Sequence, residues 1–185
     1  MSEQTLIALC GPPFVGKTTI GDALRDHYRY PFVAVDRFRP LLYGRSVSYA
    51  EDPVGDMAQV HRAYAAMRAT TDALLGLGDS VIFECTLSKI SYQHQNIDFL
   101  LEQHPLINLR IILCWIPDEK EEIIKTRVAE RDISQSPSGA TSITDHRRVR
   151  ERFENIAHPH YRLDTSLPFE ECLRQAIAYI DVPRK

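Results

Sequence analysis

The sequence has no apolar run that approaches the length needed to cross a bilayer. Its first residues, Met1 to Gln4, also lack the basic segment followed by an apolar one that marks a secretory signal. We therefore expect no membrane partner and a cytoplasmic location. Internal repeats and low-complexity tracts are missing as well.

Paired cysteines are a further absence, because none of the four cysteines belongs to a C-x-x-C pair. Cys10, Cys85 and Cys114 lie in or at the end of apolar, strand-like runs, and Cys172 lies in a segment with helical spacing. This pattern is not that of a zinc site or a disulfide framework. It predicts buried, reduced thiols.

The chain also has no excess of positive charge, since its formal net charge is -3 and its pI is about 6.2. No global field is therefore available to gather nucleic acid. The most basic stretch, Lys120 to Arg152, has acids interleaved with its arginines and lysines, which favours a solvated helix surface. With 44% hydrophobic and 25% charged residues, the 185 residues have the composition of one globular domain spanning 1–185.

A phosphate-binding loop is the strongest signal that the sequence does contain. The stretch Gly11-Pro12-Pro13-Phe14-Val15-Gly16-Lys17-Thr18 matches the pattern G-x-x-x-x-G-K-[ST] at every fixed position. An apolar run precedes it and a helical segment follows, so successive backbone N–H groups and the positive helix end can hold a polyphosphate. The pattern predicts that Lys17 reaches the β- and γ-phosphates of ATP and that the Thr18 hydroxyl binds Mg²⁺, with Thr19 also in the nucleotide site.

Short apolar runs alternate with helical segments along the rest of the chain. This alternation predicts a five-stranded parallel sheet covered on both faces, a three-layer α/β/α sandwich. Together with the phosphate-loop motif, it indicates an α/β fold of the P-loop NTPase type, in which the segment at 127–142 is expected to form a helical lid. We expect strands at 6–10, 31–35, 81–83, 109–115 and 160–163. We expect helices at 19–28, 57–75, 89–104, 117–132, 145–157 and 169–179, a loop-rich flap on the acceptor side at 38–56, and a mobile loop at 134–142.

Two carboxylates stand where the expected second and third strands end. Ligands of open parallel sheets bind beyond the carboxyl ends of the strands, which selects Asp36 and Glu84. Asp36 is the candidate for orienting or deprotonating an acceptor hydroxyl, and Glu84 for holding Mg²⁺ through its water shell. The alternative is that each carboxylate only caps the next segment.

Three arginines are candidates for contacting phosphate. Arg39 follows Asp36 by three residues, although a surface position explains it equally well. Arg127 and Arg131 are spaced i,i+4, so one helix face presents both to a lid at 127–142 that supplies positive charge to the transferred group. Pairing with acids on the same helix is the alternative for these two residues.

These features together resemble the small P-loop kinases of the AAA_33 type. That group includes polynucleotide 5′-kinase domains, zeta-toxin-like and chloramphenicol-phosphotransferase-like enzymes, and gluconate or shikimate kinases. Asp36-Arg37-Phe38-Arg39 is similar to the D-x-x-R element, which implies a general base and a phosphate-binding arginine. Arg127 to Asp132 is similar to the R-x-x-x-R lid signature. Leu163-Asp164-Thr165-Ser166 resembles the turn near the adenine, which implies roles for Asp164 and Thr165.

The chain departs from this group at two places. Glu84 stands where such kinases often have Asp, and Cys85-Thr86-Leu87 replaces an Asn-bearing turn. The 38–56 flap matches no acceptor pocket that we can name. We interpret the aromatic residues near these segments as packing residues rather than as acceptor contacts. They are Tyr43, Tyr49, Tyr92 and His94.

The sequence therefore predicts an ATP-dependent kinase that moves the γ-phosphoryl group to a hydroxyl of a small molecule. ATP is favoured over GTP because the base-reading N-K-x-D element is absent. A polynucleotide 5′-hydroxyl kinase is the less favoured alternative, supported by D-x-x-R and the basic 120–152 region but opposed by the pI. A non-catalytic ATP-sensing module is the third interpretation. The pattern does not give the oligomeric state.

Overall fold

The computed structural model describes residues 4–44, 46–131 and 140–183. Residues 132–139 of the expected lid, and with them most of the expected mobile loop, lie outside the described residues. The strands are β1 Thr5–Cys10, β2 Phe32–Ala34, β3 Val81–Glu84, β4 Asn108–Trp115 and β5 His160–Asp164. The α-helices are α1 Lys17–Tyr28, α2 Val35–Tyr43, α3 Pro53–Gly76, α4 Ile90–Gln93, α5 Phe99–Gln103, α6 Glu121–Glu130, α7 Ile143–Glu151 and α8 Phe169–Ile180.

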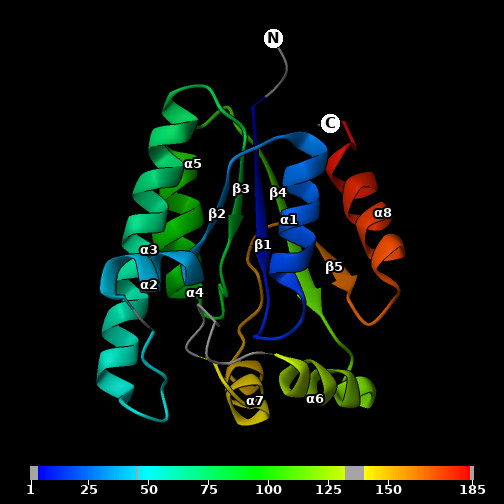
Figure 1. The fold of residues 1–185 in the computed structure, drawn as a ribbon. Coiled ribbons are helices and arrows are strands. Elements are labelled where there is room, and N and C mark those ends of the chain that lie inside the picture. Colours follow the sequence, from blue (N-terminus) through cyan, green and yellow to red (C-terminus); the bar gives the residue numbers. More distant parts are fainter. Residues whose placement is uncertain (1–3, 45, 132–139, 184–185) are drawn as a thin grey trace.

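The five strands form one sheet in the order β2-β3-β1-β4-β5, and every neighbouring pair is parallel. The predicted five-stranded parallel α/β sheet is therefore confirmed. All strands point toward one end of the molecule, where α6 and α7 lie, while the start of β1 and the end of α8 lie at the opposite end (Figure 1). Every connection between strands therefore carries the chain back to the amino edge of the sheet. The carboxyl ends of all five strands lie together at the other edge.

Alternation along the central strand divides the core into two layers. Leu6 and Ala8 of β1 face α3 and α5, where Met67 and Leu100 pack against them. The alternate residues of β1 face α1 and α8 on the other side of the sheet. Because successive side chains of a strand point to opposite faces, one fully buried strand supplies both layers. Figure 1 shows α3 to α5 on one side of the sheet and α1 and α8 on the other.

The flap at 38–56 is more helical than the sequence suggests, and this corrects the expectation of a loop-rich segment. Helix α2 starts directly after β2 and continues through Pro40, whose missing N–H leaves the Asp36 carbonyl without its intrahelical donor. Helix α3 starts at Pro53 because the Asp52 side chain accepts hydrogen bonds from the backbone N–H groups of Val54 and Gly55, at 3.2 and 2.9 Å. Irregular chain is confined to the turn between the two helices.

Other boundaries differ in smaller ways. The helix expected at 89–104 contains a π-helical turn, His94–Asp98, between α4 and α5. The helix expected from Pro117 opens as a 3-10 turn, Asp118–Lys120, before α6. Helix α7 begins at Ile143, because a reciprocal capping box between Ser142 and Asp145 fixes its start. It ends at Glu151, before the expected end at residue 157.

All four cysteines are buried free thiols, which confirms the prediction of unpaired cysteines. Burial raises the pKa of Cys114 to about 12 and raises that of Cys10 further. These thiols are therefore protonated and serve as small apolar core residues. In the part of the chain that the structure describes, no helix combines the length and the apolarity that a bilayer crossing requires.

Candidate functional site

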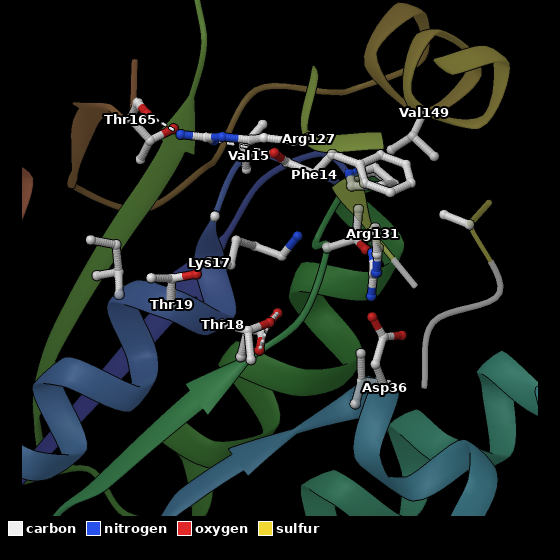
Figure 2. A pocket seen from close by; sticks show the side chains of 18 of the residues that line it. Phe14, Val15, Lys17, Thr18, Thr19, Asp36, Arg127, Arg131, Val149 and Thr165 are labelled. Atoms are coloured by element: carbon white, nitrogen blue, oxygen red, sulfur yellow. Dashed lines mark hydrogen bonds between the residues drawn. The ribbon is translucent and has the colours of Figure 1, made fainter. Parts of the chain in front are cut away.

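The carboxyl edge of the sheet opens into a cavity of about 610 Å³ (Figure 2). It is lined from the phosphate loop, both helices of the flap, the end of β3, the end of α6, and α7. The sequence-predicted residues that it brings together are Pro13, Phe14, Val15, Gly16, Lys17, Thr18, Thr19, Asp36, Arg39, Glu84, Arg127, Arg131 and Thr165. Three further predicted residues, Gly11, Pro12 and Asp164, do not line it.

The phosphate loop has a backbone that few other sequences would accept. Gly11 has a φ of +136°, and a Cβ there would lie 2.2 Å from the carbonyl oxygen of Cys114 on β4. Gly16 has a φ of +87° as the residue that caps α1. The buried Lys17 ammonium donates to the carbonyl of Pro12 at 2.9 Å. Gly11 and Pro12 thus shape the loop from outside the cavity and hold Lys17 at its mouth.

Thr18 and Glu84 meet across the cavity floor. The Thr18 hydroxyl lies 3.2 and 3.0 Å from the two carboxylate oxygens of Glu84. Burial raises the pKa of Glu84, while the charge of Lys17 opposes this shift. Both groups offer only oxygen, the ligand that Mg²⁺ prefers.

A magnesium ion at this floor would have few protein ligands. Within the described ranges, no group of three or more His, Cys, Asp or Glu residues is placed to hold a metal. Mg²⁺ usually binds through one or two protein oxygens, substrate phosphates and retained water. The Thr18 and Glu84 pair at the foot of the phosphate loop fits that mode of binding.

Glu84→Gln should separate stability from metal binding. Because the pKa of Glu84 is raised in the folded state, its contribution to stability is fully present below about pH 4.5 and is lost as the pH rises through the folded-state pKa. We therefore expect the variant to have a higher Tm than the wild-type protein at pH 7.5 without Mg²⁺, with the gap closing as the pH falls. One kcal/mol corresponds to about 2–4 °C in a domain of this size.

The same variant should lose part of the Tm increase that ATP and Mg²⁺ together produce, because a neutral amide attracts a cation less. Differential scanning calorimetry with and without Mg²⁺ measures both effects. Glu102→Gln, at an exposed position on α5, is the matched control. A Tm at pH 7.5 below that of the wild-type protein would contradict the burial argument.

Asp36 stands at the opening of α2 with its carboxylate uncommitted. No side-chain cap bond is formed at the start of this helix, so the capping alternative does not describe the structure. Among the described residues, Asp36 has no hydrogen bond or ion pair. Figure 2 shows its carboxylate pointing across the cavity toward the Arg131 guanidinium. An acid in this position is available to a hydroxyl that enters the cavity.

The expectation that Arg39 contacts phosphate stays a prediction, because Arg39 lines the cavity with protein partners on one of its nitrogens and an unpaired Nε. Its side chain is 4% exposed, and its guanidinium donates to Asp56 at 2.8 Å and to the carbonyl of Val47 at 2.6 Å. Gln59 accepts from the same nitrogen at 3.3 Å. Arg39 lines the cavity, but these contacts make it the residue that joins α2 to α3 and to the turn between them.

Arg127 and Arg131 both line the cavity. Of the acids that could pair with them on the same helix, Glu122 pairs with Lys125 instead, Glu130 has no ion pair among the described residues, and Asp132 lies outside them. Arg127 donates to the carbonyls of Phe14 and Thr165, at 3.2 and 2.8 Å. Burial lowers its pKa, and no acid among the described residues pairs with it. Arg131 lies just beyond α6 with its guanidinium 5.2 Å from the centre of the Phe14 ring. Two guanidinium groups thus flank the phosphate loop, and neither forms an ion pair within the described part of the chain, although the Asp36 carboxylate points toward Arg131 (Figure 2).

Of the two residues predicted in the turn after β5, Thr165 lines the cavity and Asp164 does not. The carbonyl of Thr165 accepts from Arg127, and Thr165 lines the cavity. Asp164 does not, because its carboxylate accepts from the backbone N–H and the hydroxyl of Ser166, at 2.9 and 2.5 Å. Lys120 lies 3.5 Å from the other oxygen. The side chain of Asp164 therefore holds the turn, which corrects the expectation that it faces a nucleotide.

The structure adds residues that the sequence analysis did not select. His146 of α7 donates from Nδ1 to the carbonyl of Pro13 at 2.7 Å, and burial lowers its pKa, which favours the neutral ring. This bond ties α7 to the phosphate loop. Two arginines of α7, Arg148 and Arg152, line the cavity at the same i,i+4 spacing as the predicted pair. In the sequence, acids are interleaved with these arginines, so the segment resembles a solvated helix surface and the spacing of Arg148 and Arg152 does not stand out.

The fold is shared with solved structures of small kinases. One is a sugar kinase from Janibacter sp., with a TM-score of 0.69 and 20% identity over 97% of this chain and 95% of that one. A gluconokinase from Sinorhizobium meliloti has a TM-score of 0.61 and 19% identity, over 97% and 93%. A shikimate kinase from Aquifex aeolicus has a TM-score of 0.60 and 16% identity, over 96% of each chain. Identities this low establish the fold alone.

Sequence comparison gives the family. No curated protein sequence matches the chain. A profile of the AAA_33 family, described as an AAA domain, matches residues 6–156. The match contains the phosphate loop, both carboxylates of the carboxyl edge and the two arginines at the end of α6, Arg127 and Arg131. The chain therefore belongs to the AAA_33 family.

Proposed function

We propose that this protein is an ATP-dependent kinase that transfers the γ-phosphoryl group to a hydroxyl of a small-molecule acceptor. The observation that carries the proposal is the shared cavity. One wall is a phosphate loop with Lys17 at its mouth, and the opposite wall offers the uncommitted carboxylate of Asp36. The likeness to solved kinases supports the same assignment.

The nucleotide side of the cavity supplies charge and orientation. Backbone N–H groups of the loop and the start of α1 surround the phosphates, and Lys17 bonds the β- and γ-oxygens. Arg127 and Arg131 neutralise charge that develops on the transferred group. Thr18, and Glu84 through water, would hold Mg²⁺, which would supply further positive charge to the phosphates. Lys17, Arg127 and Arg131 already line the same cavity, so their charges are preorganised for the reaction.

The acceptor side supplies the base. A hydroxyl held between Asp36 and the terminal phosphate loses its proton to the carboxylate as its oxygen bonds to phosphorus. The bond from phosphorus to the bridging oxygen breaks at the same time, and ADP leaves. Because phosphoryl transfer requires little covalent chemistry from the protein, positioning and charge stabilisation provide most of the rate.

The contacts of the basic region bear on the polynucleotide alternative. Arg147 pairs with Glu121 at 2.7 Å, and Arg150 pairs with Asp118. These partners reduce the positive surface that a strand of nucleic acid needs. Arg39 is likewise engaged inside the flap. Both observations favour a small molecule as the acceptor.

ADP release across a panel of hydroxyl compounds tests the proposal. With ATP and Mg²⁺ present, we expect at least one small molecule to raise ADP release well above the rate without acceptor, with one phosphorylated product formed for each ADP. A protein that binds ATP and releases almost no ADP with any acceptor is a nucleotide sensor. Transfer only to oligonucleotide 5′ ends, with binding that weakens as salt rises, would support the polynucleotide alternative.

Arg127→Gln should weaken ATP binding. Its guanidinium lies between the phosphate loop and the turn after β5, so the substitution removes a charge beside the phosphates and releases both carbonyls. Hydrogen bonds to charged groups contribute about 1.5–3 kcal/mol, and we expect the KM for ATP to rise about 10–100-fold. Steady-state kinetics measures this change. Arg174→Gln, on the exposed face of α8, should leave it unaltered, and an unchanged KM for Arg127→Gln would remove the assignment.

A further inference from the structure

The half of the cavity beyond Asp36 has two dissimilar walls. One is apolar and aromatic, with Met57, Val60 and Tyr64 from α3 and Tyr92 from α4. The rings of Tyr64 and Tyr92 stack with centroids 5.4 Å apart. The other wall is helix α7, and Figure 2 labels Val149 where it lies at this end of the cavity.

Two arginines of α7, one turn apart, line this second wall. Arg148 lies with its guanidinium 3.7 Å from the centre of the Tyr49 ring and pairs with Asp145 at 2.9 Å. Its Nε is buried and has no hydrogen-bond partner. Arg152, the residue that follows the last turn of the helix, is exposed, and its side chain forms no ion pair or hydrogen bond among the described residues. The α7 wall of the cavity therefore carries positive charge that is only partly paired.

Asp145 bonds only one nitrogen of the Arg148 guanidinium. One carboxylate oxygen of Asp145 caps the helix and accepts hydrogen bonds from the backbone N–H groups of Thr141 and Ser142 at 2.9 and 3.1 Å. The other oxygen takes one nitrogen of Arg148. The Nε of Arg148 is buried without a partner, and Nη1, which is not buried, has no hydrogen bond among the described residues, so an accepting ligand can bond to Nη1.

The other arginines of the same helix behave differently. Arg147 donates twice to Glu121, at 2.7 Å each, and Arg150 pairs with Asp118 and donates to the carbonyl of Ile116. Neither lines the cavity. Pairing on α7 therefore follows the face of the helix. The two arginines that do not line the cavity each pair with an acid of segment 118–121, whereas Arg152, which lines it, pairs with no acid among the described residues.

None of the described acids that line the cavity pairs with Arg148 or Arg152. Asp56 is taken by Arg39 at 2.8 Å. Glu84 contacts Thr18 at the floor, next to the phosphate loop. Asp36 is the remaining acid, and in the proposed function it faces the acceptor hydroxyl. Arg148 has Asp145 as its counter-charge and Arg152 has none among the described residues, so this wall carries a net positive charge that an anionic substrate can neutralise.

We infer that the acceptor is a small hydroxy compound with an anionic substituent, a carboxylate or a phosphate, bound by Arg148 and Arg152. This inference rests on the proposed kinase function and names its acceptor class. The carbon skeleton packs against the wall formed by Tyr64, Tyr92 and their neighbours, and the hydroxyl reaches Asp36. Guanidinium groups bind carboxylate and phosphate with paired, charge-assisted hydrogen bonds, so both anions satisfy the same two arginines.

Matched probes with one carbon skeleton test the inference. Glucose, gluconate and glucose 6-phosphate present no anion, a carboxylate and a phosphate, and matched sets with three to five carbons extend the panel. Binding is measured as the Tm increase in the presence of Mg²⁺ and a non-hydrolysable ATP analogue, and transfer as ADP release with ATP. We expect the anionic member of at least one set to exceed its neutral counterpart in both measurements. The anion that does so distinguishes a hydroxy acid from a phosphorylated alcohol.

Variants of α7 give the second part of the test. Arg148→Gln and Arg152→Gln should each raise the KM for the anionic acceptor about 10–100-fold and abolish most of the Tm increase that it produces. The KM for ATP should stay within about twofold, because neither residue is proposed to contact the nucleotide. Arg147→Gln, on the paired face, is the matched control and should leave both acceptor measurements unaltered.

The two proposals fail in different ways. Neutral members used as well as their anionic counterparts, or an acceptor KM that both variants leave unchanged, would overturn the anionic subsite while the kinase stands. A panel in which no anionic compound raises the Tm more than its neutral counterpart would overturn it as well. An anion-dependent Tm increase that both variants abolish, without ADP release for any compound, would support the subsite and remove the kinase.

Discussion

Lys17→Ala should lower phosphoryl transfer by about 10³-fold or more. The side chain is buried at the mouth of the phosphate loop, and its ammonium already lies 2.9 Å from the carbonyl of Pro12. Alanine removes the cation that bonds the β- and γ-phosphates, and no other lysine lines the cavity to replace it. The KM for ATP should rise as well, because the same contact binds the ground state.

The measurement is ADP release at saturating acceptor, with product formation followed in parallel. The structural cost should be small, since the substitution removes one hydrogen bond, a contribution of about 1 kcal/mol. Lys125→Ala, whose ammonium pairs with Glu122 on the exposed surface of α6, is the control and should keep normal turnover. Turnover within a few-fold of the wild-type rate in Lys17→Ala would show that the phosphate loop is not the nucleotide site.

Asp36→Asn should lower kcat by about 10²–10⁴-fold while the KM for ATP changes little. The amide has nearly the same shape as the carboxylate and cannot take the proton of the acceptor hydroxyl. Because Asp36 has no partner within the described residues, the substitution breaks no ion pair, and its effect reports on chemistry. Separation of kcat from the KM for ATP distinguishes a base from a residue that binds the nucleotide.

Steady-state kinetics with both substrates varied gives this separation. Asp26→Asn, on the exposed face of α1 beside Arg25, is the matched control and should behave as the wild-type protein does. Near-normal kcat in Asp36→Asn would remove the base assignment. A large rise in the KM for ATP with unchanged kcat would instead place Asp36 among the groups that bind the nucleotide.

Much of the site could be predicted because its residues are local in sequence or follow from the parallel sheet. The phosphate loop is one continuous stretch, and its glycine spacing carries its geometry. Asp36 and Glu84 were selected because parallel strands end at one edge, and the cavity contains both. The i,i+4 spacing likewise selected Arg127 and Arg131, which the cavity brings to the same loop.

The remaining features depend on contacts between distant segments. The spacing from Asp36 and the D-x-x-R resemblance predict a phosphate contact for Arg39, but they do not predict its bond to Asp56, which lies on another helix. Pro40 and the turn residues around it suggested loop, yet packing of α2 against α3 keeps both helical. The hydrogen bond from His146 to the carbonyl of Pro13 helps to position α7 beside the cavity, and no pattern in the sequence predicts that bond.

A crystal structure of the complex with Mg²⁺ and a non-hydrolysable ATP analogue tests the central claim most directly. We predict that the triphosphate lies inside the loop of residues 11–18, with Lys17 at the β- and γ-phosphates and the metal beside Thr18 and Glu84. Asp36 should face the terminal phosphate across a gap that a hydroxyl group fills. A nucleotide bound elsewhere, or a terminal phosphate that Asp36 does not face, would contradict the proposed phosphotransferase.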